Sequence, residues 1–192
     1  MAVHLHGVAR GRPRRRGFLR DGRQRLHRHP GRARGFALLT RGLRAVARDP
    51  ADLGARLDCR LGAWLAMAPL ASGVPMGASH GIGYVLGAAF DVPHGHTSCV
   101  LLPAVLAWNA EVNGARQREL LAQSGIGGEQ AADVVRNLVR DLDLPATLGA
   151  VGVGPANEDE VAERAMGTPW VPRNPRPIDG PHHVKEILAL AR

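Results

Sequence analysis

From Phe36 onward, the hydrophobic and polar positions of this chain follow a helical period, because apolar residues recur at steps of three and four. The first such stretch ends at Pro50, and Asp52 predicts the start of a second helix that continues to about Ser72. Trp64 and Met67 lie within this helical period, and a tryptophan and a methionine at such positions are far more often part of a hydrophobic core than contacts to a cofactor. We therefore expect the apolar stripe of the second helix to be buried: Leu57, Leu61, Trp64, Leu65 and Ala68, with Met67 beside them.

The same period predicts further helices along the rest of the chain. Pro93 separates a helix that carries His80 from one that enters near His94, which Thr97 or Ser98 would cap. A break is expected after Asn113, and no stretch alternates as a strand does. The pattern therefore predicts an all-α helical bundle, whose later helices are expected over residues 115–123, 130–142 and 158–165 and from about residue 182.

Composition divides the chain into a basic arm and a helical domain. The 192 residues are 45% hydrophobic, which suffices for one substantial core. Of the net charge of +8, residues 1–35 contribute +10 from 11 arginines and one aspartate, and the remainder contributes −2. Because the arm has no apolar period, we expect disorder over residues 1–35 and a folded domain over residues 36–192.

The arginine-rich arm could bind phosphate backbones electrostatically or act as a presequence, but its composition favours neither interpretation, and no nucleic-acid or membrane partner is expected. Phe18 is its only aromatic residue, so the stacking platform of single-strand binders is missing. It lacks the serines of a transit peptide and the apolar core of a secretory signal, and no apolar run in the chain reaches the roughly 18 residues of a membrane span. Cys59 and Cys99 are expected as small buried thiols in a reducing compartment. We therefore expect a cytoplasmic protein.

Candidate chemistry is concentrated between Gly77 and His96, a glycine-rich apolar segment that holds three of the nine histidines. His80 and His94 are 14 residues apart on two predicted helices, so their imidazoles can converge. Neutral imidazole is the commonest ligand for iron, zinc or nickel, but isolated histidines are also often hydrogen-bonded core or loop residues. Spacing leaves both interpretations open for this pair, whereas His96 is expected to be a pocket or capping residue.

The glycines of this segment do not form a dinucleotide-binding fingerprint. In GIGYVLG the third glycine comes one residue late, and Pro75 precedes it where a strand would be required. Each glycine costs a helix about 1 kcal/mol relative to alanine. Gly81, Gly83 and Gly87 therefore predict that another part of the protein approaches this helix closely.

Several motifs resemble one known family. His80, the run GIGYVLGAAF, the tripeptide Pro93-His94-Gly95 and the run LLPAVLAWN are similar to the second signature region of the iron-containing alcohol dehydrogenases, which include the maleylacetate reductases. NPRPIDGPHHVKEILALAR resembles the closing segment of the same family, within the dehydroquinate synthase-like superfamily. The resemblance covers residues 37–192 and corresponds to the C-terminal helical domain.

The resemblance implies a metal-dependent oxidoreductase. Family members hold a catalytic divalent metal, iron(2+) or zinc, beneath a domain that binds NAD(P), and exchange hydride with a small-molecule alcohol or carbonyl substrate. By motif position His80 and His94 match two of the metal ligands. Tyr84 stands where many members carry a histidine with a proton-shuttling role, for which tyrosine is weaker.

The chain also departs from the family pattern. The family's other two ligands, an aspartate-x-x-x-histidine pair, are expected just before Phe36, but no aspartate before His80 has a histidine four residues later. We therefore expect that the chain is a truncated gene product, caused by a shifted reading frame or a misassigned start, and that it is inactive alone. No catalytic or cofactor-binding residue is assigned. The alternative is a degenerate, non-catalytic metal-binding or interaction domain, and a homodimer is left open.

Overall fold

The computed structural model describes residues 30–192, and over that range the chain is helical without a strand. The predicted all-α fold is therefore confirmed. Three short 3-10 turns lie between the later helices: η1 (Gly149–Val151), η2 (Pro155–Asn157) and η3 (Val171–Arg173). The α-helices are α2 (Pro30–Arg48), α3 (Leu53–Ala71), α4 (Ala78–Phe90), α5 (His94–Ser124), α6 (Ala131–Asp141), α7 (Glu158–Met166) and α8 (Pro181–Ala189).

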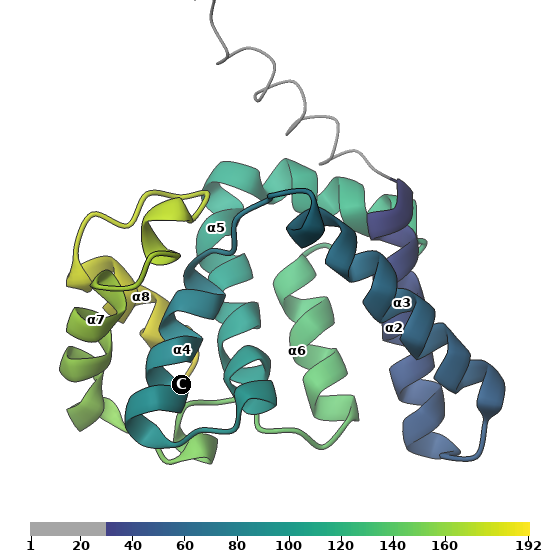
Figure 1. Cartoon of the computed structure of the whole chain (residues 1–192), viewed down its shortest axis with the longest axis horizontal. Coiled ribbons are helices and arrows are strands. Elements are labelled where there is room, and N and C mark those ends of the chain that lie inside the picture. Colours follow the sequence, from purple (N-terminus) through teal and green to yellow (C-terminus); the bar gives the residue numbers. More distant parts are fainter. Residues whose placement is uncertain (1–29) are drawn as a thin grey trace, which may run out of the picture.

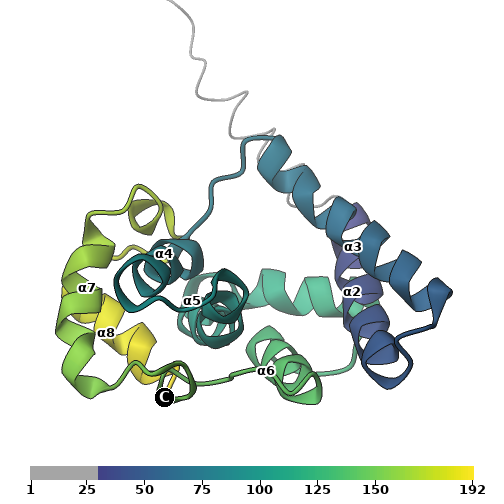
Figure 2. The same ribbon diagram turned by 60° about the horizontal axis from the view of Figure 1, so that its bottom comes forward.

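The long helix α5 is the axis about which the other helices are arranged (Figures 1 and 2). Helices α4 and α8 pack against it, α7 packs against both of these, and α6 and α2 contact α5 farther along. The main core lies among α4, α5, α7 and α8, and its largest fully buried side chains include Ile82, Leu86, Leu101, Ile187 and Leu188. Helices α2 and α3 form a hairpin at the edge of the molecule, with α3 packed on α2 (Figure 1).

Two helix boundaries differ from those expected. Helix α2 begins at Pro30, before Phe36, and Ala33 is already buried, so the last residues of the expected arm belong to the folded part. The rest of that arm, residues 1–29, lies outside the described residues. Helix α5 runs unbroken through Asn113, where a break was expected, and ends only at Gly125, whose φ of +67° is in the left-handed region.

The start of α5 also corrects the expected cap. The helix begins at His94 with Pro93 as its N-cap, so Thr97 lies within the first turn. The Thr97 hydroxyl donates a hydrogen bond of 2.8 Å back to the carbonyl of His94 and therefore caps no backbone N–H. The fixed φ of proline suits the entry to a helix, which explains why α5 starts earlier than a threonine or serine cap would allow.

Helix α3 corrects the expected orientation of an apolar stripe. As predicted, Asp52 caps the helix, and its carboxylate accepts from the N–H of Ala55 at 2.9 Å. The face packed on α2 combines small residues with the half-buried Leu65, whose Cβ would lie 3.0 Å from a Cβ added to Gly35, and a Cβ added to Gly62 would lie 2.8 Å from Leu39 Cγ. The larger apolar residues expected in the core face outward and are exposed: Leu57, Leu61, Trp64 and Met67. Since α3 is apolar on both faces, the helical period alone cannot tell which face is buried.

The two cysteines are half-buried rather than buried, and both are free thiols. Burial is the main cause that raises the pKa of each thiol, and for Cys59 the neighbouring carboxylate of Asp58 raises it further. Both thiols are therefore protonated at neutral pH. Among the helices of residues 30–192, none combines the length and the hydropathy needed to cross a bilayer.

Replacing Leu101 by alanine should destabilise the protein by about 2–5 kcal/mol, because this side chain is fully buried in the core of α5. The neighbouring Leu102, which is 37% exposed on the same helix, is the matched control, and its replacement should change the free energy of unfolding by less than about 1 kcal/mol. Urea denaturation followed by circular dichroism measures both. Equal losses in the two variants would contradict the assigned core.

Candidate metal centre

His80 and His94 meet because α4 and α5 cross closely. One close contact between them is at Gly83, where an added Cβ would lie 3.0 Å from the hydroxyl oxygen of Thr97. His80 precedes Gly83 by three residues and His94 precedes Thr97 by three, so both histidines lie about one turn before the crossing. Their ring centroids are 6.0 Å apart, with the ring planes at 80°.

A close approach was predicted at three glycines of α4, and the structure shows it at Gly81 and Gly83. At Gly81 an added Cβ would lie 2.7 Å from Val171 Cγ2, which holds η3 against the same helix. Gly87 differs, because its nearest neighbour, the carbonyl oxygen of Val92, is at an ordinary contact distance of 3.5 Å. Gly81 and Gly83 thus place two other segments beside His80.

The separation of the two imidazoles is compatible with one shared ion. Metal-to-imidazole bonds are about 2.0–2.1 Å, and the ring centroid lies about 1.1 Å behind the nitrogen, so two rings on one tetrahedral ion have centroids about 5.2 Å apart. The observed 6.0 Å is slightly longer, so a small rotation of the two side chains would bring both rings to one ion. Among the residues described, no group of three or more histidine, cysteine, aspartate or glutamate side chains is arranged to hold a metal. The pair therefore offers two ligands of a larger set.

Trp170 forms an aromatic wall beside the histidine pair. Its ring stands edge-on to His80 at a centroid distance of 4.6 Å and lies 5.4 Å from the ring of Tyr84. The contact restricts the orientations open to the imidazole of His80. Sequence reasoning missed Trp170, since it lies between the helices expected over residues 158–165 and from about residue 182. A large aromatic residue between two prolines of a loop was the available signal.

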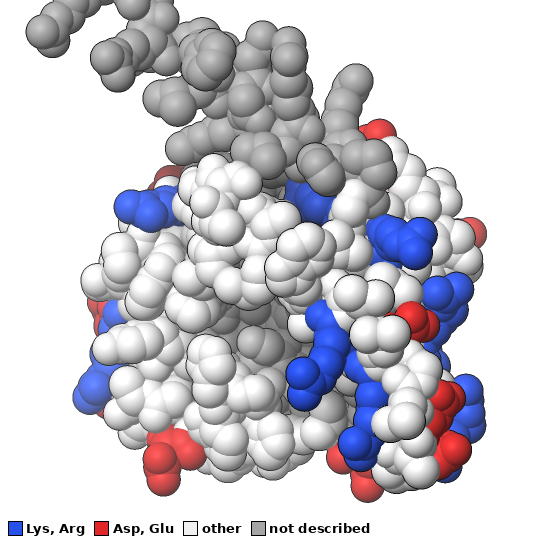
Figure 3. Space-filling model, turned by 45° about the vertical axis from the view of Figure 1, so that its right-hand side comes forward, with Lys and Arg blue, Asp and Glu red and all other residues white. Residues whose placement is uncertain are grey.

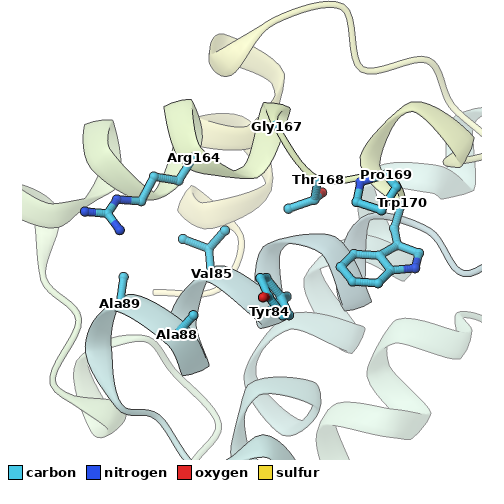
Figure 4. Close-up of a pocket in the computed structure, with 9 residues that line it drawn as sticks. All are labelled: Tyr84, Val85, Ala88, Ala89, Arg164, Gly167, Thr168, Pro169 and Trp170. Carbon is cyan, nitrogen blue, oxygen red and sulfur yellow. The ribbon is translucent and has the colours of Figure 1, made fainter.

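A cavity of about 410 Å³ adjoins this wall (Figure 4). Tyr84 and Val85 of α4 line one side, while Arg164 of α7 and Trp170 line the other parts. The lining is mostly apolar, and Arg164 supplies its positive charge while also pairing with Glu160 at 2.6 Å. Such a cavity can hold a small molecule with an apolar body and an anionic end.

A buried amide network fixes the beginning of α4. The side-chain oxygen of Asn174 accepts from the backbone N–H of Ala78 and from the amide of Asn109, each at 3.2 Å. The amide of Asn174 in turn donates to Asn109 at 2.7 Å and to the carbonyl of Arg176 at 2.8 Å. One side chain thus joins the helix that carries His80, the middle of α5 and the loop after η3. The network satisfies a helix N–H that would otherwise be buried without a partner.

The remaining candidate histidines serve other contacts. His183 accepts a hydrogen bond from the backbone N–H of Asp179, and its ring lies 4.0 Å from that of His182 and 5.6 Å from that of Trp108. His96 is half-buried in the first turn of α5. His94 and His80 are therefore the histidines whose rings the structure brings together across two helices.

Comparisons with known proteins agree with this architecture. A family model described as "Fe-containing alcohol dehydrogenase family, C-terminal" matches residues 33–191. The maleylacetate reductase of Burkholderia cepacia is 33% identical over 145 residues, which cover 76% of this chain and 40% of that protein. The maleylacetate reductase of Rhizobium sp. strain MTP-10005 is 34% identical over 140 residues, covering 72% and 39%.

Solved structures show the same similarity. The crystal structure of the Rhizobium maleylacetate reductase superposes with a TM-score of 0.73 at 28% identity, over 88% of this chain and 51% of that one. An iron-containing alcohol dehydrogenase from Corynebacterium glutamicum gives a TM-score of 0.72 at 28% identity, over 83% and 43%. The chain thus spans between about two fifths and half the length of these relatives.

Replacing Asn174 by alanine should destabilise the protein by about 1–3 kcal/mol, because the buried amide of Asn109 and the N–H of Ala78 lose their partner. Asn113, which is less buried and accepts a hydrogen bond from Gln117, is the matched control. Its replacement by alanine should lower the free energy of unfolding by less than about 1 kcal/mol. Chemical denaturation of both variants measures the difference. An Asn174 variant whose free energy of unfolding equals that of the unchanged protein would show that the network does not stabilise α4.

Proposed function

Because this chain belongs to the iron-containing alcohol dehydrogenase family, we propose that it is the metal-binding helical part of an NAD(P)-linked oxidoreductase acting on an alcohol or carbonyl. His80 and His94 supply two ligands of its divalent iron or zinc ion. The observation that carries this proposal is the convergence of the two imidazoles from separate helices at 6.0 Å. The contact of Trp170 with His80 supports it, since a metal ligand must be held in one orientation.

The chemistry of this donor pair suits the proposed ion. Imidazole nitrogen binds both iron and zinc, and the bound ion would act as a Lewis acid on the oxygen of an alcohol or carbonyl. The residues of the chain have the task of holding the two rings in place. Gly83 sets the helix crossing, and Asn174 fixes the start of the helix that carries His80.

The cavity beside Trp170 is the proposed site for the body of the substrate. Trp170 contacts His80 and also lines the cavity, so this one side chain connects the cavity to the histidine pair, although neither histidine lines the cavity itself. The Burkholderia and Rhizobium relatives are named for the reduction of maleylacetate, an anionic compound. Arg164 in the cavity lining suits an anionic end of this kind, although its pair with Glu160 must then open.

The described chain supplies only part of a dehydrogenase site. Two histidines leave a catalytic ion short of the three protein ligands that such sites usually have. Residues 30–192 contain no strand, and so no strand-turn-helix unit that could cradle a dinucleotide. Tyr84, exposed at the cavity, replaces the histidine that many family members carry at this position. We infer that the chain alone binds a metal weakly and does not turn over substrate.

A non-catalytic interaction domain is the second candidate function. The observation that favours it is the row of large apolar side chains exposed on α3, a feature that hydride transfer does not require. The two candidates differ in what they require of the histidine pair, because an interaction domain needs no metal affinity there. Metal titration of the purified chain therefore separates them.

Replacing either His80 or His94 by alanine should weaken binding of Co²⁺ or Zn²⁺ by at least about tenfold, or about 1.4 kcal/mol, because half of the donor pair is lost. Replacing His182, exposed on α8, should change the affinity by less than about twofold. Isothermal titration calorimetry of the full chain measures all three variants. Equal weakening by the His182 variant would place the ion on surface histidines and refute the proposed centre.

The purified full chain with added iron or zinc should show no NAD(P)-dependent oxidation of simple alcohols, because hydride transfer requires a nicotinamide held against the substrate. Absorbance of the reduced cofactor at fixed enzyme concentration measures this directly. Turnover that disappears in the His80 and His94 variants would overturn the inference that the chain alone is inactive. It would also mean that further ligands complete the site.

A further inference from the structure

A groove of about 900 Å³ runs along one face of α5 and shares no lining residue with the cavity beside Trp170. On α5 its lining extends from Leu102 to Gln123, mostly at steps of three and four residues, which keeps it on one side of the helix. The start of α2, the segment that leads from α3 into α4 and the residues at the end of η3 form the other walls. Neither His80 nor His94 lines this groove, and the function proposed above assigns it no task.

The length of the groove favours a peptide over a compact small molecule. Leu102 and Gln123 are 21 residues apart on one helix, which corresponds to roughly 32 Å along its axis. An extended peptide rises about 3.3 Å per residue, so about ten residues span this distance. A compact ligand would leave much of the groove unfilled.

The lining changes its chemistry along α5. The part that includes the earlier turns of the helix is apolar: Val74, Pro75, Leu102, Val105 and Leu106. After Asn109 the lining from α5 becomes mainly polar, with Asn113, Arg116, Gln117 and Gln123. A ligand that fits both parts therefore needs apolar groups at one end and polar or charged groups at the other.

Basic side chains outnumber acidic ones in the lining. Arg32, Arg116 and Arg173 come from three separate elements, whereas Glu119 is the only carboxylate among the described residues that line the groove. Glu119 accepts a hydrogen bond of 3.0 Å from Gln123. Over residues 30–192, no ion pair joins Arg116 or Arg173 to a carboxylate. The groove therefore has a positive charge that an anionic ligand would complement.

The spacing of the cations suits carboxylates that lie several residues apart. Arg173 is next to Asn174, whose side chain is hydrogen-bonded to Asn109 at the middle of the groove. Arg116 follows Asn109 by seven residues, or roughly 10 Å along the helix. Two carboxylates three residues apart in an extended peptide are separated by a similar distance, about 10 Å. The two arginines can thus each contact a different acidic residue of one peptide.

A nucleic-acid backbone and the N-terminal residues of the chain are poorer matches for this groove. Nucleic acid is bound by basic residues that gather in a patch or stripe. On the side of the molecule shown in Figure 3, the described Lys and Arg residues are instead spread out, and carboxylates lie among them. Residues 1–29 contain nine arginines and one aspartate, so they would bring further positive charge to the arginines of the groove.

We propose that the groove along α5 binds an acidic, extended peptide segment of a partner protein. The apolar residues of the peptide lie on Leu102 and Leu106, and its carboxylates pair with Arg173 and Arg116. Binding of this kind does not depend on a metal ion or on turnover. The proposal can therefore succeed or fail separately from the metal centre on α4 and α5.

Fluorescence anisotropy with a labelled ten-residue peptide tests the binding. The peptide carries leucines in its first half and three glutamates at intervals of three residues, and the full chain should bind one copy of it, more weakly as salt is added. The variant R116E/R173E should raise the dissociation constant at least about tenfold, because attraction becomes repulsion at two positions. The control R56E/R60E makes the same change in net charge at exposed positions of α3 outside the groove and should change it less than about twofold.

Three further results decide between the proposed ligand and its alternatives. Replacing the glutamates of the peptide by glutamine should abolish most of the binding, and equal binding of that peptide would overturn the proposal. Competition by a single-stranded DNA oligonucleotide or by tripolyphosphate as strong as that of the unlabelled peptide would do the same, since it would indicate a general anion site. A self-association of the chain that R116E/R173E removes would assign the groove to a second copy and also refute the proposal.

Backbone amide shifts of the ¹⁵N-labelled full chain locate the peptide. We expect the largest changes on titration along residues 102–123 and 173–175, which line the groove. Changes centred on α3 or α7 would place the peptide elsewhere and contradict the proposal. Circular dichroism of R116E/R173E and R56E/R60E confirms that both variants remain folded, so that a loss of binding is not a loss of structure.

Discussion

The close crossing of α4 over α5 is the contact on which the arrangement of the site depends. At Gly83 the backbone of α4 lies so near Thr97 that an added Cβ would be 3.0 Å from the threonine hydroxyl, and the threonine side chain or the helix would have to shift by a few tenths of an ångström. Because His80 and His94 each stand three residues before this point, a shift of the crossing would separate their rings. A glycine at a helix interior costs stability, and here that cost is offset by a geometry that a larger residue would forbid.

Contacts from the last third of the chain hold this crossing in place. Asn174 bonds both the start of α4 and the middle of α5, while Val171 fits against Gly81 and Trp170 against His80. All three residues belong to a segment with little regular secondary structure, which is stabilised by its contacts with the helices. The loop thereby orients the histidine pair and forms one wall of the adjacent cavity.

Sequence reasoning predicted the parts of this site that depend on local pattern and motif. The helical period gave the fold class, and the glycines of α4 indicated a close approach that the structure shows at Gly81 and Gly83. It could not predict Trp170 or Asn174 as neighbours of α4, because their contacts join residues about 90 positions apart. It also expected a break after Asn113, but that residue accepts from Gln117 within the continuous helix.

The error on α3 has a physical cause. Where α2 meets α3, an added Cβ at Gly42 would lie 2.9 Å from Cys59 Sγ and one at Gly62 would lie 3.0 Å from the carbonyl of Gly35, so the two backbones are too close for large side chains. Tight packing of this kind stabilises the hairpin through many small contacts rather than through burial of leucine or tryptophan. Leu65 packs beside Gly35, whereas most other large residues of α3 lie on the opposite face, where water is an unfavourable neighbour. The same glycines that close the hairpin therefore leave the large apolar side chains of α3 exposed on its other face.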